Sequence, residues 1–286
     1  MLRYPLLTLA PPIRLTHIWG FVMTSHRARI LLLPVLLLAT VAIAQDNGHE
    51  FHWTGKLADN NIVEIKNING WIEAGPSSGD QVEVSAEKSG PDADQVKIQV
   101  VPSNDGVTIC AIYPHGSTTC EPGESWHANN VHGDRTKVNF TVKLPNNLRF
   151  SGQSINGEVK AEELSRFVRA TSVNGSIHVS TKSWAEAETV NGSVEVAMGS
   201  ADWNGKLKIE TVNGSITLKM PDDFNADVSF RSVNGNLTTD FPLTVKGTMG
   251  GWGGHRADGR IGNGGRDLQV ETVNGSVRLE KGNGSL

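Results

Sequence analysis

Two cysteines and three nearby histidines are the densest group of residues in this 286-residue sequence that could bind a metal or undergo redox chemistry. Cys110 and Cys120 lie close together, and His115, His127 and His132 follow within the same stretch. Zinc sites usually contain tightly spaced Cys-x-x-Cys or His-x-x-x-His pairs, and neither spacing occurs here. We therefore expect a disulfide between the cysteines, the default in an oxidising compartment, and no metal site or cofactor.

Acidic residues on predicted strands are the second candidate, because polysaccharide lyases and glycosidases use facing carboxylates or acidic calcium ligands. Glu195, Asp240 and Glu280 fall on outward strand positions, and Asp222-Asp223 lies in a predicted turn. No two of them form a pair recognisable from the sequence, and neither Gly-x-Ser-x-Gly nor His-Glu-x-x-His occurs. We predict no catalytic residues.

Tryptophans are the third candidate, because an exposed indole can stack on a sugar ring or contact a protein. Trp184 and Trp203 lie in connections between predicted strands, where they would cover the edge of a core. Trp71, Trp126 and Trp252 are the remaining candidates for contact with a partner.

An internal repeat must position these residues. Asn-Gly recurs with Val or Ile one position before Asn, an apolar residue three positions after it, and mostly an apolar residue five positions after it. The repeated pairs are Asn69-Gly70, Asn156-Gly157, Asn174-Gly175, Asn191-Gly192, Asn213-Gly214, Asn234-Gly235 and Asn274-Gly275. This pattern predicts two short strands per unit, joined at a corner where Asn and Gly adopt positive φ. We expect the serines after Gly to bond back to their own turn.

Two architectures fit the repeat. A type I′ turn at each Asn-Gly would give antiparallel hairpins, whereas a corner would give coils whose strands pair in parallel with their copies. Successive asparagines from Asn156 to Asn234 are 18, 17, 22 and 21 residues apart, about one small coil each. The last spacing, 40 residues to Asn274, equals two coils or one coil with an insertion. We predict an all-β parallel β-solenoid, with a hairpin-built β-sandwich as the alternative.

Two stretches interrupt the repeat. Residues 72–146 carry longer alternating runs and both cysteines, and we predict that they form an antiparallel capping sheet, because a solenoid end exposes unpaired strands. Residues 246–265 are rich in glycine, which predicts a loop. The stretch lacks the Gly-x-x-x-x-Gly-Lys-Ser/Thr phosphate-binding motif.

The N-terminal residues have the features of an export signal. A better start than Met1 is Met23, followed by basic residues and the apolar run 30–42, which ends in Ala42-Ile43-Ala44. We expect cleavage before Gln45, so that residues 1–44 are removed and residues 45–286 form one domain. The apolar run is shorter than the roughly 20 residues of a membrane span, so we expect no span in the mature chain.

Charge excludes one class of partner. Residues 1–44 hold four arginines and no acidic residue, so their removal changes the formal net charge from −4 to −8. An acidic chain with scattered lysines repels phosphate backbones, and we expect no nucleic-acid binding.

The sequence resembles the bacterial putative-adhesin family, whose members are exported or envelope-associated domains of unknown function. The resemblance rests on the Thr/Ser-Val-Asn-Gly-Ser repeats, on residues 107–114 with the later Cys120, and on residues 259–264 leading into 268–279. It covers roughly residues 51–281. The resemblance implies a repetitive β fold and supplies no catalytic residues.

Together these features predict a non-catalytic, adhesin-like scaffold in the periplasm, at the cell envelope or outside the cell. Its partner would be an unknown envelope protein, a glycan or a surface. A carbohydrate-active β-helix enzyme and a periplasmic sensing module are the alternatives.

Overall fold

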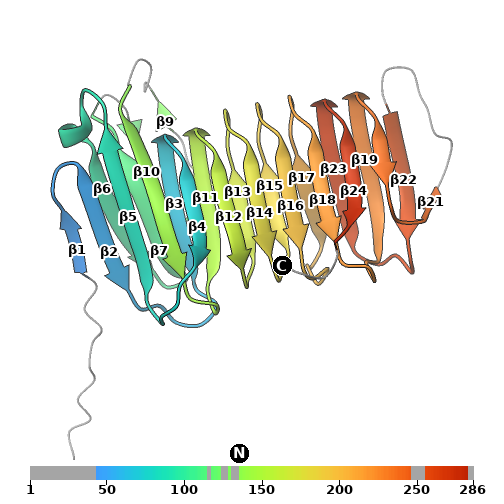
Figure 1. Cartoon of the computed structure of the whole chain (residues 1–286), viewed down its shortest axis with the longest axis horizontal. Helices are drawn as coiled ribbons and strands as arrows, with labels where there is room; N and C mark the ends of the chain where they lie inside the picture. The colour runs from blue at the N-terminus through green and yellow to red at the C-terminus, as the bar shows by residue number, and fades with distance from the viewer. Residues whose placement is uncertain (1–42, 115–116, 124–127, 130–134, 246–254, 283–286) are drawn as a thin grey trace, which may run out of the picture. The chain divides into compact units, whose positions relative to one another are not determined.

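The structure, a computed structural model, describes residues 43–114, 117–123, 128–129, 135–245 and 255–282. The strands in these ranges form two eleven-stranded sheets, which we call sheet A and sheet B (Figure 1). A third, two-stranded sheet consists of β8 (Ser117–Thr118) and β9 (Ala128–Asn129). No helix in the described ranges is long and apolar enough to cross a membrane. Most of the predicted signal segment lies outside the described residues.

Seven coils form the repetitive part, each made of one strand of sheet B, an Asn-Gly corner and one strand of sheet A. The sheet B strands are β3 (Ile62–Asn69), β11 (Arg149–Asn156), β13 (Val168–Thr171), β15 (Ala185–Glu188), β17 (Lys206–Glu210), β19 (Ala226–Asn234) and β23 (Asp267–Asn274). Their sheet A partners are β4 (Ile72–Pro76), β12 (Val159–Leu164), β14 (Ile177–Thr181), β16 (Val194–Met198), β18 (Ile216–Met220), β20 (Leu237–Thr239) and β24 (Val277–Lys281). Within each sheet these strands pair in parallel with their copies, which confirms the predicted β-solenoid and excludes hairpins at the corners.

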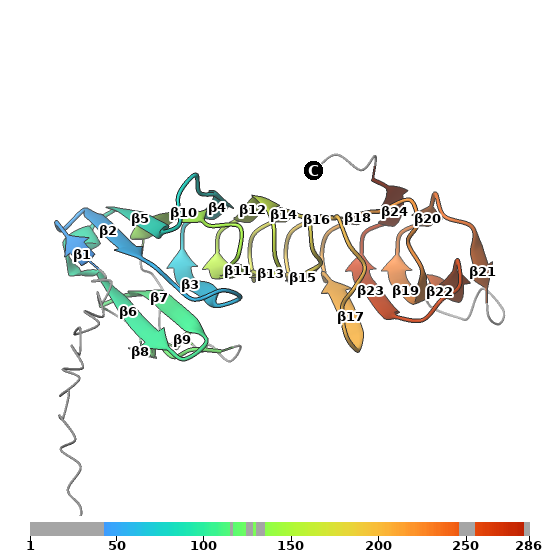
Figure 2. The same cartoon turned by 90° about the horizontal axis from the view of Figure 1, so that it is seen from below.

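Figure 2 shows the two sheets as two facing layers, and the buried apolar side chains of their strands form the core between them. Residues three and five positions after each corner asparagine point inward and stack on their equivalents. Ile177 pairs with Val194 and Val194 with Ile216, and all three are buried. Burying a side chain of this size contributes about 1.5–3 kcal/mol, so the alternating pattern accounts for the inward face of each strand.

The N-terminal end is closed by longer strands. β7 (Gly106–Ile112) pairs in parallel with β3, and β10 (Lys137–Leu144) pairs in parallel with β4. Beyond them β6 (Lys97–Ser103), β5 (Val82–Ser89), β2 (Glu50–Gly55) and β1 (Ile43–Asp46) are added antiparallel. The capping sheet predicted within residues 72–146 is therefore present, although β7 and β10 extend the parallel stack.

The C-terminal coil is inserted between two earlier coils. β23 pairs with both β17 and β19, and β24 pairs with both β18 and β20. Between β20 and β23 the chain forms β21 (Leu243–Val245) and β22 (His255–Ile261), and β22 pairs antiparallel with the free edge of β19. The 40 residues between Asn234 and Asn274 thus contain this hairpin, after which the chain places β23 between β17 and β19.

Part of the predicted Gly-rich loop, residues 246–265, is a strand. Residues 255–261 form β22 because Ala257 and Ile261 are buried, which gives the segment an inward face. Residues 246–254, including Trp252, lie outside the described residues.

The reason for glycine at the corners differs from the predicted one. Only Gly70 among the seven corner glycines has a left-handed φ, +113°, and no corner asparagine has a positive φ. At Gly214 an added Cβ would overlap the carbonyl oxygen of Gly192 in the neighbouring coil, and Gly192 stands in the same relation to Gly175. Glycine is required because successive coils approach too closely for any side chain.

Side chains at the corner bond from coil to coil. The Ser or Thr two positions before Asn donates to a glycine carbonyl of the neighbouring coil, as Thr211 Oγ1 does to Gly192 O at 2.8 Å. The corner asparagines form a ladder in which each Nδ2 donates to the next Oδ1 at 2.7–2.8 Å. The serine prediction was wrong in its partner, since Ser215 Oγ accepts Ser276 N of the adjacent coil at 3.1 Å.

The close approach of the coils predicts the effect of Gly214→Ala. The added methyl group overlaps backbone that cannot move without breaking the Asn ladder, so we expect a loss of about 2–3 kcal/mol in the free energy of unfolding. Urea denaturation measures it. The control is Gly79→Ala, where the new Cβ meets only Ser77 Oγ at 3.9 Å. Equal stability of the two variants would contradict the proposed role of the corner glycines.

Candidate binding groove beside Trp71

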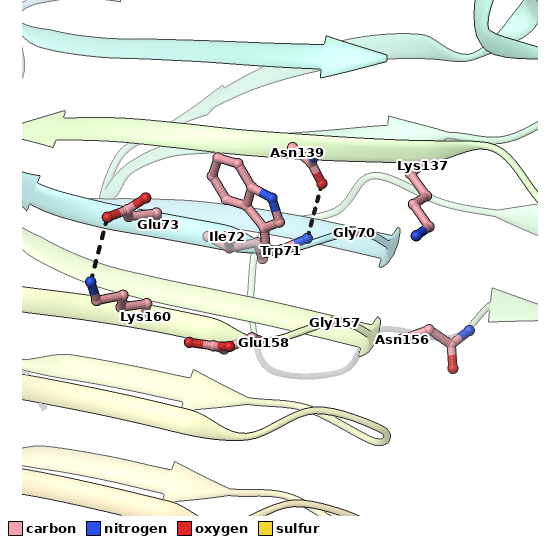
Figure 3. A pocket seen from close by; sticks show the side chains of 10 residues that line it. All are labelled: Gly70, Trp71, Ile72, Glu73, Lys137, Asn139, Asn156, Gly157, Glu158 and Lys160. Carbon is pink, nitrogen blue, oxygen red and sulfur yellow. Dashed lines mark hydrogen bonds and ion pairs between the residues drawn. The ribbon is translucent and has the colours of Figure 1, made fainter. Parts of the chain in front are cut away.

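A groove opens on the outer face of sheet A, where the first coil meets β10 (Figure 3). Its volume is about 530 Å³, within the range of roughly 300–1,000 Å³ typical of small-molecule sites. Its lining residues are Gly70, Trp71, Ile72, Glu73, Lys137, Asn139, Asn156, Gly157, Glu158 and Lys160. The groove is therefore built from the start of β4, the start of β12 and β10.

Trp71 is the only Trp, Tyr or Phe side chain among the described residues that is exposed, with 39 % of its surface accessible. It occupies the position directly after the corner glycine. In four of the six later coils this position holds a small serine, such as Ser176 or Ser193, and the other two carry Glu158 and Asn236. The structure therefore places Trp71, one of the three tryptophans considered for partner contact, in a concave site, and its contact with a partner stays a prediction.

The corner before Trp71 departs from the repeat. Asn67 stands where other coils have Ser or Thr, and its Nδ2 donates to Gly70 O at 3.1 Å and to Val138 O at 2.7 Å. Gly70 adopts its left-handed φ, and a Cβ there would overlap Val138 O. Asn139 Oδ1 accepts the backbone N–H of Trp71 at 3.3 Å. Because Asn67 is fully buried and bonds to two backbone carbonyls, the indole is presented from a fixed corner.

The charged groups in the groove balance. Lys160 Nζ lies 3.0 Å from Glu162 and 3.7 Å from Glu73, and its hydrogen bond to Glu162 raises the pKa of Lys160. Glu158 lies 4.0 Å from His178 on the next coil. Lys137 forms no ion pair within the described part of the chain. Two lysines and two glutamates thus line the groove, together with two asparagine amides.

The groove lacks the burial that carboxylate catalysis requires. A general acid of the glycosidase type has a pKa raised by an apolar environment. The side chains of Glu73 and Glu158 are 51 % and 48 % exposed. The arrangement suits recognition of a ligand better than proton transfer to it.

The acidic residues proposed from the sequence form no catalytic pair. Glu195 Oε1 lies 2.6 Å from Lys219 Nζ, and this hydrogen bond lowers the pKa of Glu195. Glu280 faces Arg278 at 3.5 Å, and Asp240 Oδ2 accepts the backbone N–H of Lys281 at 3.4 Å. Among the described residues no three His, Cys, Asp or Glu side chains are grouped so that they could hold a metal ion.

Several of the residues considered as candidate contact or metal-binding residues lie outside the described residues. Trp126 and Trp252 lie outside the described residues, as do His115, His127 and His132. Trp203 is buried and donates to Asp267 O, and Trp184 packs on Phe167, which agrees with their predicted covering role.

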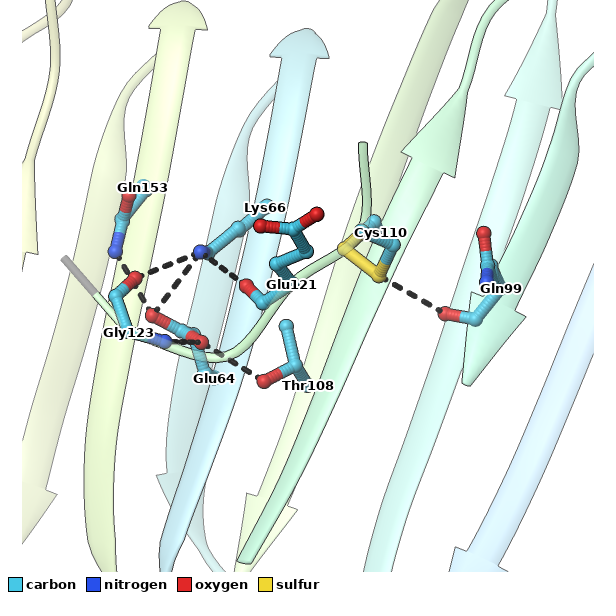
Figure 4. A network of polar contacts seen from close by, with 9 residues as sticks. Glu64, Lys66, Gln99, Thr108, Cys110, Glu121, Gly123 and Gln153 are labelled. Atoms are coloured by element: carbon cyan, nitrogen blue, oxygen red, sulfur yellow. Dashed lines mark hydrogen bonds and ion pairs between the residues drawn. A yellow bond between two sulfur atoms is a disulfide. The ribbon is translucent and has the colours of Figure 1, made fainter. Parts of the chain in front are cut away.

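The disulfide joins a buried polar network that sequence reasoning missed. Cys110 and Cys120 are bonded, with Cα atoms 5.7 Å apart. Just beyond Cys120 the chain crosses the outer face of β3, where Lys66 Nζ donates to Glu121 O and Gly123 O, both at 2.7 Å (Figure 4). The Lys66 side chain is fully buried, and burial lowers its pKa against the opposing effect of Glu64.

Glu64 completes this network. Its carboxylate accepts hydrogen bonds from Thr108 Oγ1 at 2.8 Å, Gln153 Nε2 at 2.9 Å and the backbone of Gly123 at 3.1 Å. Lys66 Nζ lies 3.5 Å from Glu64 Oε1. The only sign of this network in the sequence is that Glu64 and Lys66 both occupy outward positions of β3. The same pattern is equally typical of a solvent-exposed strand face.

A second, smaller hollow lies on the outer face of sheet B. It has a volume of about 480 Å³, and Arg169 forms a two-pronged contact with Glu186 there, at 2.6 and 2.7 Å. Because its most prominent cation is already neutralised in this way, we regard it as a solvated sheet face.

Comparisons with known proteins give one family and several similar solved structures. The family described as Toastrack DUF4097 matches residues 124–280, more than half of the chain. A putative cell adhesion protein from Clostridium sporogenes is 10 % identical with a TM-score of 0.44, over 81 % of this chain and 99 % of that one. A putative adhesin from Bacteroides fragilis is 11 % identical with a TM-score of 0.30, over 81 % and 96 %. No curated protein matches the sequence.

The buried pair predicts a large effect of Lys66→Met. The variant leaves Glu64 without its cation and two carbonyls without a donor, so we expect a loss of about 3–5 kcal/mol in the free energy of unfolding. Adding Glu64→Gln removes the stranded charge and should recover part of that loss. Chemical denaturation of single and double variants measures both effects.

The matched control is Lys56→Met, which breaks the exposed pair that Lys56 forms with Asp80 at 2.6 Å. Exposed pairs contribute about 0–1 kcal/mol. If Lys66→Met were as mild as this control, the buried network would not be what holds the segment after Cys120.

Proposed function

The chain belongs to the Toastrack DUF4097 family, and from this premise we propose that it is an exported, non-catalytic, adhesin-like scaffold that binds a partner through the groove beside Trp71. The family match agrees with the resemblance to bacterial putative-adhesin domains seen in the repeats. The observation that carries the proposal is the exposed indole of Trp71, held in a concave site by buried polar groups.

The form of the molecule supports a binding role. The outer face of sheet A consists of polar side chains on coils whose corners are locked by the Asn ladder and by Ser and Thr bonds to glycine carbonyls. A rigid face loses little conformational entropy when a partner binds. An anchoring aromatic at its end supplies the kind of contact that dominates interface energies.

Export is supported by the disulfide and by the N-terminal sequence. Disulfides persist in oxidising compartments and are rare in the cytosol. The pair Cys110–Cys120 is bonded, and the small-residue pattern before Gln45 fits signal peptidase cleavage.

The mass of the exported protein tests the export proposal directly. When the full chain is produced with its leader, we expect the protein recovered outside the cytoplasm to begin at Gln45 and to be two hydrogen masses lighter than the reduced form. Intact-mass spectrometry before and after reduction measures both. Arg29→Glu combined with Arg27→Glu, which removes the basic region before the apolar run, should leave the chain uncleaved in the cytoplasm. Recovery of full-length, reduced protein in every fraction would end the export proposal.

Binding is tested by Trp71→Ser, which introduces the residue that four of the six later coils carry at this position. Truncating an anchoring Trp usually costs about 2 kcal/mol, so we expect binding of the mature protein to envelopes of its source cells to fall roughly tenfold or more. The measurement is a saturation binding curve of the labelled mature protein, residues 45–286, on these envelopes. The control is Val212→Ser, whose side chain has the same exposed fraction, 39 %, but lies away from the groove. Equal binding by both variants would contradict a role for the groove.

A further inference from the structure

The lining of the groove restricts the chemistry of its ligand. Trp71 supplies the one exposed apolar surface, since Ile72 is completely buried, and the other side chains are charged or amide groups. An apolar peptide or a lipid would have to desolvate these polar groups without replacing their hydrogen bonds, which is unfavourable. The groove therefore suits a ligand that is polar around its rim and has one apolar face.

Charge restricts the ligand further. A carboxylate or phosphate would face Glu73 and Glu158, and a cation would face Lys137 and Lys160. A hydroxyl group both donates and accepts hydrogen bonds, so several hydroxyls on one ring can satisfy lysine donors and carboxylate acceptors at once. The mixture of groups in the groove thus favours a neutral polyhydroxylated ligand.

We propose that the groove binds a neutral carbohydrate, with the C–H face of one pyranose ring stacked on Trp71 and its hydroxyls bonded to the surrounding lysine and glutamate side chains. The proposal rests on the proposed function and names the ligand class of the same groove. Lys137 projects from β10, Glu158 directly precedes β12, and both line the groove with Trp71 (Figure 3). They are the residues we expect to contact the ring hydroxyls.

The ligand should extend beyond one ring. Glu158 directly follows the corner glycine of its coil. In the next two coils along sheet A the equivalent residues are the small Ser176 and Ser193. These side chains leave the face open toward the later coils. A linear oligosaccharide can therefore continue from Trp71 across the neighbouring strands, whereas a site for a single sugar would be closed at this side.

The experiment compares four tetrasaccharides, two neutral, one cationic and one anionic, by calorimetric titration of the mature protein. The probes are a neutral N-acetylglucosamine tetramer, the cationic glucosamine tetramer and an anionic galacturonate tetramer, with a neutral cellulose-type tetramer as a second neutral probe. We expect at least one neutral probe to bind at least roughly tenfold more tightly than either charged probe. Trp71→Ser should weaken that binding by a similar factor, and Trp71→Tyr should retain most of it, since a phenol ring can still stack.

Separate outcomes distinguish this inference from the function on which it rests. If envelope binding depends on Trp71 but neither neutral probe binds or competes, the carbohydrate assignment is overturned while the scaffold function stands. Tighter binding of a charged probe also overturns it. If neutral probes bind and Trp71→Ser has no effect, the site assignment is wrong. Neutral binding that is lost with Trp71→Ser, kept with Trp71→Tyr and able to compete with envelopes supports both.

Discussion

The contact on which the rest of the structure depends is the close approach of successive coils at their Asn-Gly corners. Each corner glycine except Gly70 lies so close to the glycine carbonyl of a neighbouring coil that no Cβ fits between them. That carbonyl is satisfied by a Ser or Thr hydroxyl, and the adjacent asparagines bond to one another. One steric requirement thus determines three columns of the repeat, and the apolar columns are aligned by it. Stability in such a stack is largely a sum of neighbour contacts.

The groove lies where this requirement is relaxed. β10 is an element of the cap and carries no Asn-Gly corner, so the first coil meets it with different chemistry. Asn67 bonds to Val138 O, Gly70 turns to a positive φ, and the next residue can be a tryptophan. Departures from a repeat rule are expected at functional sites, and here the departure also creates the concavity.

The sequence predicted whatever depended on local pattern and failed where distant contacts decide. Alternation around each Asn-Gly, with spacings near one coil, was enough to predict the parallel solenoid, the cap and the disulfide. The reason for glycine was missed because a tight turn and a close approach of two backbones favour the same residue. The Glu64–Lys66 pair was missed because its burial comes from residues 121–123, which no periodicity connects with β3. Trp71 was one of three equivalent tryptophans until the structure placed it in a groove.

The inserted C-terminal coil shows why repeat columns alone cannot specify the order of coils. Because the coils after the second all present the same Val, Asn, Gly and Ser or Thr positions, these columns alone would let β23 pair with more than one exposed coil edge. The hairpin of β21 and β22 removes this ambiguity, since β22 occupies the outer edge of β19 and leaves only its inner edge open. The last coil then gains a parallel neighbour on each side in both sheets, and the open edge of sheet B becomes the short strand β21. Short edge strands discourage pairing with other chains. Insertion therefore places the last coil between two parallel neighbours and leaves only the short strands β20 and β21 at the C-terminal edges of the two sheets.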